Sequence, residues 1–209
     1  KTVHEISRCK DYEEYQTMAE ANFNLVLHPE ARFAAEDFHE KLRIPFIELR
    51  RLYQIDKITK QYQALGNVLG IPFEDHEAEA AALDSVKCLK SAKPDAVFAI
   101  EEFMNWEPFE LALALVKYGF WVAEIYGTLT AENFVYLKNL SELSLQTKVF
   151  SNMEPTMLYY DPEESGVTIT IGKDACYYHP DVKNVMWNEE VQPYGYAGVR
   201  HLCERLLEV

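Results

Sequence analysis

Short apolar runs alternate with longer amphipathic segments along most of the chain. Several runs have the length of buried strands, at residues 21–27, 45–49, 96–100, 121–126, 147–151, 167–171 and 184–187. The segments between them carry apolar residues at helical spacing, which predicts helices over 30–42, 56–69, 74–92, 108–118, 130–143, 173–178 and 196–207. Strand–helix–strand alternation predicts an α/β protein in which helices flank parallel sheets.

The strands divide unevenly along the chain, and Pro94 opens the second series. Residues 94–209 hold enough predicted strands for one α/β domain, whereas residues 1–93 offer two clear strands, which make a poor sheet. We therefore expect the first part to be an incomplete unit with a connecting helix. It either lost partner strands or borrows packing from the second domain.

Residue types that favour helix ends mark several of these boundaries. Asp56 is a candidate N-cap for the helix that Gly70 and Pro72 close. Thr130 is a candidate N-cap for the helix that runs to about residue 143.

Composition narrows the classes of partner. The chain has 34 acidic against 20 basic residues and a net charge of −14. This argues against a surface for nucleic acid or for anionic membranes, which needs clustered lysine and arginine. No apolar run reaches the ~18 residues of a transmembrane candidate. No signal peptide is visible, and the chain starts at Lys1 in an ordinary polar stretch, so we expect a fragment of a longer protein.

The four cysteines are scattered, at positions 9, 88, 176 and 203, and none forms a C-x-x-C pair. Such spacing is typical of reduced thiols in a cytoplasmic protein rather than of an iron–sulfur site. The chain also lacks G-x-G-x-x-G, Walker A, G-x-S-x-G and H-E-x-x-H sequences. A dinucleotide fingerprint and the common hydrolase signatures are therefore not supported.

Two polar sites directly follow predicted strands. His28 comes after the run 21–27, and the pair Glu101-Glu102 comes after the run 96–100. Ligands of open α/β sheets bind outside the carboxyl ends of strands, so both sites are candidates for cofactor contacts. An imidazole can ligate a metal or move a proton, and paired carboxylates can bind a cation or act as acid and base. The plainer interpretations are a turn residue ahead of Pro29 and a solvated loop.

Two turns before predicted helices are further candidates. Gly172 leads into a helix whose first N–H groups suit an anion, and Cys176 and His179 stand one helical turn apart. These two side chains do not complete a metal site, and core packing of Cys176 is the alternative. Before the last helix, Gly195 and Gly198 permit close approach of the backbone to a ligand, or a purely structural turn.

These features, in their order, resemble the nitrogenase component 1 family, which includes cofactor-assembly scaffolds and dark-operative chlorophyll-type reductases. The segments that carry the resemblance are Asn22–His28, Phe38–Glu48, Tyr53–Asp56, Leu65–Gly70, Leu113–Val122 and Gln192–Val199. They are similar to the family's LNLV strand, its EKYGIPW segment, its later helical steps and its GPY segment.

The resemblance implies three Rossmann-like domains in the parent protein. This chain would hold part of one, at residues 1–93, and another at residues 94–209. It also implies homomeric or heteromeric complexes and a separate ATP-dependent iron–sulfur reductase as electron donor. His28, Glu101, Cys176, His179 and Gly195 would contact a cofactor, with His28 as a metal ligand. The parent's cofactor would include an iron–sulfur cluster whose cysteines lie upstream, and the cofactor contacted by this fragment stays open.

The sequence departs from the family at functional positions. His28 stands at about the place of a cysteine that holds the larger cofactor in catalytic nitrogenase, and no histidine occurs near Trp187, where a second ligand is expected. Reduction of dinitrogen is therefore not expected. Arg43 and Gln54 replace family glycines, so we expect altered local turns.

Three functions remain open from the sequence. The first is the C-terminal portion of a nitrogenase-like oxidoreductase, or of an assembly scaffold without turnover, that forms walls of a cavity for a metal cluster, tetrapyrrole or substrate. The second is a clamshell module that binds a metal or small molecule. The third is an interaction domain whose acidic surface docks a basic partner.

Overall fold

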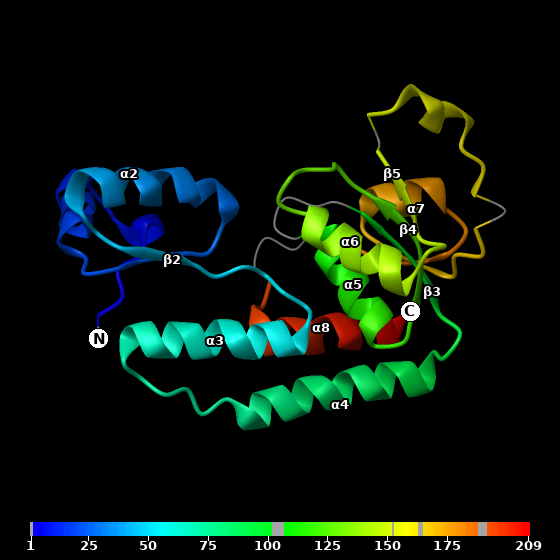
Figure 1. Ribbon diagram of the computed structural model, residues 1–209, viewed down its shortest axis with the longest axis horizontal. Helices are drawn as coiled ribbons and strands as arrows, with labels where there is room; N and C mark the ends of the chain where they lie inside the picture. The colour runs from blue at the N-terminus through cyan, green and yellow to red at the C-terminus, as the bar shows by residue number, and fades with distance from the viewer. Residues whose placement is uncertain (1, 102–106, 152, 163–164, 188–191) are drawn as a thin grey trace. The chain divides into compact units, whose positions relative to one another are not determined.

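A computed structural model describes residues 2–101, 107–151, 153–162, 165–187 and 192–209 (Figure 1). The chain divides into two compact units, Lys1–Arg50 and Arg51–Val209. Both consist of helices and parallel strands, so the predicted α/β class is confirmed. Among the described residues, no helix combines the length and the apolar character of a membrane span.

The first unit is built on a small parallel sheet. Strand β1 (Asn24–Val26) pairs with β2 (Phe46–Glu48), and helix α2 (Arg32–Leu42) connects them. The Arg32 guanidinium lies 2.7 Å from the Glu48 carboxylate, which ties the start of α2 to the second strand. The remaining elements are η1 (Ile6–Arg8), α1 (Tyr12–Gln16), η2 (Thr17–Glu20) and η3 (Pro29–Ala31).

The turn after α2 keeps a glycine-type backbone although arginine occupies it. Arg43 ends the helix with φ 60° and ψ 24°, in the left-handed region that glycine favours. The altered turn expected at this position is therefore wrong. The Arg43 N–H donates a hydrogen bond to the His39 carbonyl, which closes the last turn of the helix.

Replacing Arg43 with glycine should stabilise the first unit by about 1 kcal/mol, because it removes the left-handed penalty of a side chain. Amide hydrogen exchange of α2 measures this local free energy of opening. Gly70→Ala is the matched control, because Gly70 holds the same conformation (φ 63°) at the end of α3 (Ile55–Leu69) with no atom within 4 Å of a new Cβ. Gly70→Ala should lower the free energy of opening of α3 by about the amount by which Arg43→Gly raises that of α2. Equal protection of the α2 amides from hydrogen exchange in Arg43→Gly and in wild type would contradict the backbone strain assigned to Arg43.

The second unit contains a five-stranded parallel sheet of order β5-β4-β3-β6-β7. Its strands are β3 (Val97–Glu101), β4 (Trp121–Tyr126), β5 (Lys148–Phe150), β6 (Ile169–Ile171) and β7 (Lys183–Val185). Besides α3, its helices are α4 (His76–Ala92), α5 (Pro108–Lys117), α6 (Phe134–Leu143), η4 (Pro155–Tyr159), α7 (Lys173–Tyr178) and α8 (Gly195–Glu208). Each strand and helix predicted from the apolar pattern is present, with ends shifted by a few residues.

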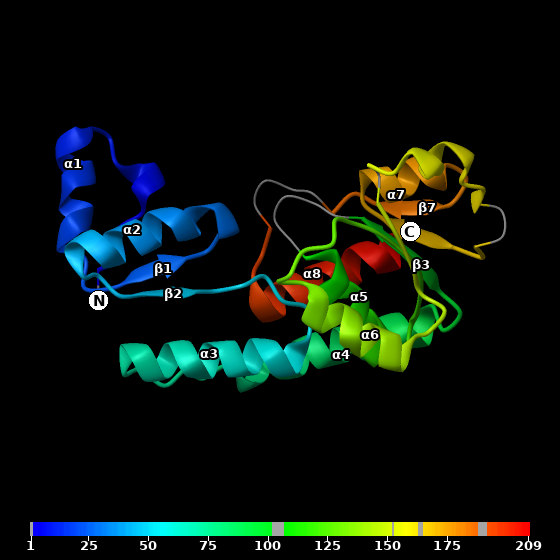
Figure 2. The same cartoon turned by 45° about the horizontal axis from the view of Figure 1, so that its top comes forward.

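Helices cover both faces of this sheet (Figure 2). One face contributes Phe98, Ile100 and Val122 to a large core that also contains apolar side chains of α4, α5 and α8. The other face packs Ala99 and Tyr126 against α7. The fold is therefore a doubly wound sheet, in which ligand sites are expected at the carboxyl edge.

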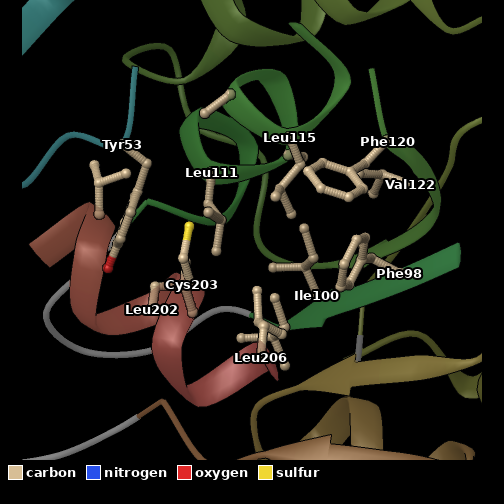
Figure 3. Packing of buried hydrophobic residues seen from close by; sticks show 14 of the residues in the cluster. Tyr53, Phe98, Ile100, Leu111, Leu115, Phe120, Val122, Leu202, Cys203 and Leu206 are labelled. Carbon is tan, nitrogen blue, oxygen red and sulfur yellow. The ribbon is translucent and has the colours of Figure 1, made fainter. Parts of the chain in front are cut away.

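Cys203 lies in the larger core, among buried apolar side chains of α5, α8 and the sheet (Figure 3). A cavity of about 10 Å³ lies beside the Cys203 side chain, lined by residues that include Tyr53, Leu111, Leu115 and Leu206. This is about the volume of one water molecule, so this cavity has no room for a cofactor.

Helices α3 and α4, which the sequence analysis grouped with the first domain, lie in the second compact unit. Leu89 of α4 and Ile58 of α3 share a core with Leu202 of α8. The predicted domain boundary after residue 93 refers to the domains of a longer parent protein, not to compact units of this chain. It stays a prediction.

Two predicted N-caps are wrong. Helix α3 follows Gln54 rather than Asp56. The N–H groups of Tyr53 and Gln54, just before the helix, bond to Glu110 of α5, and the first helical N–H, that of Ile55, bonds to the Tyr118 hydroxyl. Helix α6 follows Asn133 rather than Thr130, because the Asn133 amide bonds to the Thr130 N–H and the Thr128 carbonyl and holds residues 128–133 in a turn.

Candidate functional site

The predicted anion site at the start of α7 is filled by the protein itself. Glu101 ends β3, is 2% exposed, and its carboxylate accepts hydrogen bonds from the N–H groups of Asp174 and, at 3.2 Å, Ala175. Burial raises the pKa of Glu101, and these N–H groups oppose the increase. Glu101 is therefore a cap for the helix, and its sequence neighbour Glu102 lies outside the described residues.

Gly172 makes this contact possible. Its φ is 111°, and a Cβ at this position would collide with the Glu101 side chain. Gly172→Ala should therefore lower the free energy of unfolding by about 2 kcal/mol or more, measured by urea denaturation.

Gly166→Ala is the control for the effect of a positive φ alone, because Gly166 also has a positive φ, 67°, but no atom of the described residues lies within 4 Å of a new Cβ. We expect the loss in Gly166→Ala to be smaller by about 1 kcal/mol or more. Equal losses in the two variants would refute the contact between Gly172 and Glu101.

A second buried carboxylate organises the opposite end of α7. Glu124 lies on β4 and is 1% exposed. Its Oε2 lies 2.7 Å from Nε2 of His179 and accepts a hydrogen bond of 2.7 Å from the Tyr126 hydroxyl. Its Oε1 accepts a hydrogen bond from the Tyr160 hydroxyl. His179 follows the last residue of α7, so it is not on a helical face shared with Cys176.

Aromatic rings enclose this Glu124 cluster, which consists of Glu124, Tyr126, Tyr160 and His179. The Tyr126 ring stacks on Tyr178 with centroids 4.9 Å apart, and on Phe150 at 5.6 Å. Burial raises the pKa of both Tyr126 and Tyr160, so their hydroxyls stay protonated and can donate. The arrangement joins β4, α7 and the segment after β5 and fixes the carboxyl edge of the sheet.

Glu110 forms a third buried cluster on the opposite face. It is 0% exposed, and accepts hydrogen bonds from the N–H groups of Tyr53 (2.8 Å) and Gln54 (3.0 Å) and from the Gln54 amide (3.1 Å). The Tyr118 hydroxyl bonds to the Tyr53 carbonyl at 2.6 Å and accepts from the Ile55 N–H. Burial raises the pKa of Glu110 to about 7. This cluster fixes the start of α3.

The backbone at Gly195, which was expected to permit close approach to a ligand, lies close to a side chain of the protein itself. Its φ is 57°, and a Cβ there would overlap the Tyr62 hydroxyl. A Cβ on Gly198 would lie 2.6 Å from the Pro193 carbonyl oxygen. Both glycines are used by the turn into α8, which is the structural alternative considered from the sequence.

His28 and Cys176 are partly exposed. His28 precedes η3, and its Nδ1 accepts a hydrogen bond of 3.3 Å from the Glu30 N–H. This is the geometry of a turn residue ahead of Pro29. The structure brings Glu101, Cys176 and His179 to α7 and places Gly195 at α8, whereas His28 belongs to the other compact unit.

Glu110 and Glu124 were not predicted as site residues from the sequence. Each is a single acid inside an apolar run, Leu111–Leu115 following one and Trp121–Ala123 preceding the other. An acid at a position that the pattern assigns to the core is a usable signal, because a buried charge requires specific partners.

The thiols of the second unit do not fit an iron–sulfur cluster. Cys203 lies in the apolar core, where burial raises its pKa to about 12, whereas Cys88 is exposed on α4 and Cys176 belongs to α7. A cluster needs several thiolates side by side. In the described part of the chain, no three His, Cys, Asp or Glu side chains are placed to share a metal ion.

Comparisons with known proteins agree with the fold. The structure titled "Nitrogenase Cp1 at pH 6.5" matches with a TM-score of 0.71 at 17% sequence identity. The match covers 91% of this chain and 45% of the nitrogenase chain, so this sequence spans less than half of that protein. No curated protein matches the sequence. The profile of the nitrogenase component 1 type oxidoreductases matches residues 3–208. Because that match spans nearly the whole sequence, the chain belongs to the nitrogenase component 1 type oxidoreductase family.

Proposed function

We propose that this chain is part of a nitrogenase component 1-type oxidoreductase and forms walls of a cavity for a metal cluster, tetrapyrrole or substrate. The main iron–sulfur ligands would come from other parts of the parent protein. The observation that carries the proposal is the family match over residues 3–208, combined with thiols that do not fit a cluster.

The cavity wall in this proposal is the carboxyl edge of the five-stranded sheet, where ligands of doubly wound proteins bind. Glu101 and His179 act there as positioning residues, because one caps α7 and the other bonds to Glu124. Cys176 and Gly195 would contribute contacts from α7 and α8. His28, in the first unit, is proposed separately as a cofactor contact and metal ligand.

The proposed context is a cytoplasmic complex of nitrogenase-like subunits, homomeric or heteromeric. Electrons would reach it from a separate ATP-dependent iron–sulfur reductase. Nucleic acid is not a proposed partner, because the chain has a net charge of −14 and nucleic-acid surfaces need clustered basic residues.

Iron and acid-labile sulfide analysis tests the proposal, on the anaerobically purified full-length parent and on this chain alone. We expect a stoichiometric cluster and visible absorption in the parent, and neither in the isolated chain. A parent without iron or visible absorption would remove the redox assignment. A stoichiometric cluster on the isolated chain would refute the claim that the ligands lie elsewhere. A parent that passes its cluster to another protein without reducing a substrate would favour the assembly scaffold.

A further inference from the structure

Two buried side-chain donors beside the start of α8 lack acceptors. Arg51 Nη1 donates a hydrogen bond of 2.6 Å to the Gln192 Oε1 atom. Arg51 Nε and Gln192 Nε2 are both buried and have no hydrogen-bond partner among the residues that the structure describes. Gln192 is 6% exposed. Buried polar atoms are nearly always paired, so each exception needs an explanation, such as an ordered water or a bound ion.

The orientation of the Gln192 amide follows from its contact with Arg51. A guanidinium has only donors, so the atom that faces Nη1 at 2.6 Å must be the amide oxygen. The amide NH₂ group therefore faces away from Arg51 Nη1 and is a donor without an acceptor. A rotated amide would place two donors against each other and would not solve the deficit.

The guanidinium is held in a geometry that suits an oxyanion. Its central carbon lies 4.7 Å from the centre of the Tyr194 ring, so the ring covers one face of the group. The Nε–H lies in the guanidinium plane, where carboxylate and phosphate oxygens bind. Among the described residues, no carboxylate forms an ion pair with Arg51, although the chain as a whole has a net charge of −14.

The backbone adds to the local positive potential. Tyr194 directly precedes α8, a helix of 14 residues, and supplies no side-chain hydrogen bond to its first turn. Figures 1 and 2 show the segment that leads into α3 beside the segment that leads into α8. The N-terminal end of a helix attracts anions.

We propose that Arg51 and Gln192, at the start of α8, bind a small oxyanion, which is a carboxylate or phosphate group of a ligand. The anion would accept hydrogen bonds from Arg51 Nε and Gln192 Nε2 and balance the charge of the guanidinium. This inference is independent of the proposed cluster chemistry, because it uses only donors of this chain.

The test is a titration of the isotope-labelled chain with inorganic phosphate and, separately, with acetate, followed by NMR of the arginine Nε–H and glutamine NH₂ signals. We expect saturable shifts of the Arg51 and Gln192 signals at constant ionic strength, and none with chloride. The tighter of the two probes assigns the ligand class. Shifts that chloride reproduces, or signals that do not move, would overturn the proposal and leave water as the partner of these donors.

Variants separate this site from general charge effects. Arg51→Met should weaken binding by roughly tenfold or more, because a charge-assisted contact is lost. Gln192→Glu should do the same, because it places an internal carboxylate beside Arg51. Arg200→Met, at an exposed position of α8, is the matched control and should leave binding unchanged. Unchanged affinity in folded Arg51→Met or Gln192→Glu protein would also overturn the proposal, and the wild-type titration does not depend on either variant folding.

Discussion

Replacing Glu124 with alanine is expected to lower the free energy of unfolding by about 3–5 kcal/mol, the cost of removing one partner of a buried pair. The carboxylate is the shared acceptor of the Tyr126 and Tyr160 hydroxyls and the partner of His179. Its removal leaves buried polar groups unpaired and opens a cavity in the aromatic cluster. Urea denaturation of the full chain near neutral pH, followed by tyrosine fluorescence, measures the loss.

Two variants determine whether the shared acceptor is the cause. Tyr160→Phe removes one donor and leaves Glu124 with two partners, so it should cost only about 1 kcal/mol. In the double variant Glu124→Ala/His179→Ala, the two losses should not add, because both remove the same pair. A loss below about 1 kcal/mol in Glu124→Ala, or additive losses in the double variant, would show that the cluster contributes no coupled stabilisation.

The second large effect is a pH dependence that originates at Glu110. Burial raises its pKa from 4.5 to about 7 in the folded protein. The folded state therefore binds this proton more tightly than the unfolded chain does. The associated stability is fully present below about pH 4.5 and is lost as the pH rises through about 7. We expect a loss of about 3 kcal/mol over this range, since one unit of pKa shift corresponds to about 1.4 kcal/mol.

Glu110→Gln isolates this contribution, because other carboxylates titrate equally in both proteins. The glutamine NH₂ group meets an N–H donor of Tyr53 or Gln54, so the variant should be less stable than wild type at pH 5. That difference should shrink by about 2.5 kcal/mol on going to about pH 8. A difference between the two proteins that stays constant from about pH 5 to 8 would assign the pH dependence to other groups.

The α/β class and the order of elements followed from the sequence alone. The run 96–100 is apolar throughout and the run 121–126 is apolar except for Glu124, which is the pattern of strands buried on both faces. The segments between such runs have helical periodicity. Gly70 was identified as the end of α3 because a left-handed residue there favours glycine. These features depend on neighbours in the chain, and local patterns are sufficient to predict them.

The roles of the polar residues were decided by the tertiary structure. Glu110 binds the N–H group of Gln54, the residue before α3, across 56 positions of sequence, and Glu101 caps α7 across 74. A nearby residue such as Asp56 was therefore the wrong candidate for a helix end. His179 was expected to contact a cofactor, and its imidazole instead bonds to Glu124. The physical reason is that a buried charge or N–H group without a partner costs free energy. Any element that the fold brings within hydrogen-bond distance can supply that partner. Sequence spacing does not encode that proximity, so the sequence determined the elements and the folded chain determined their partners.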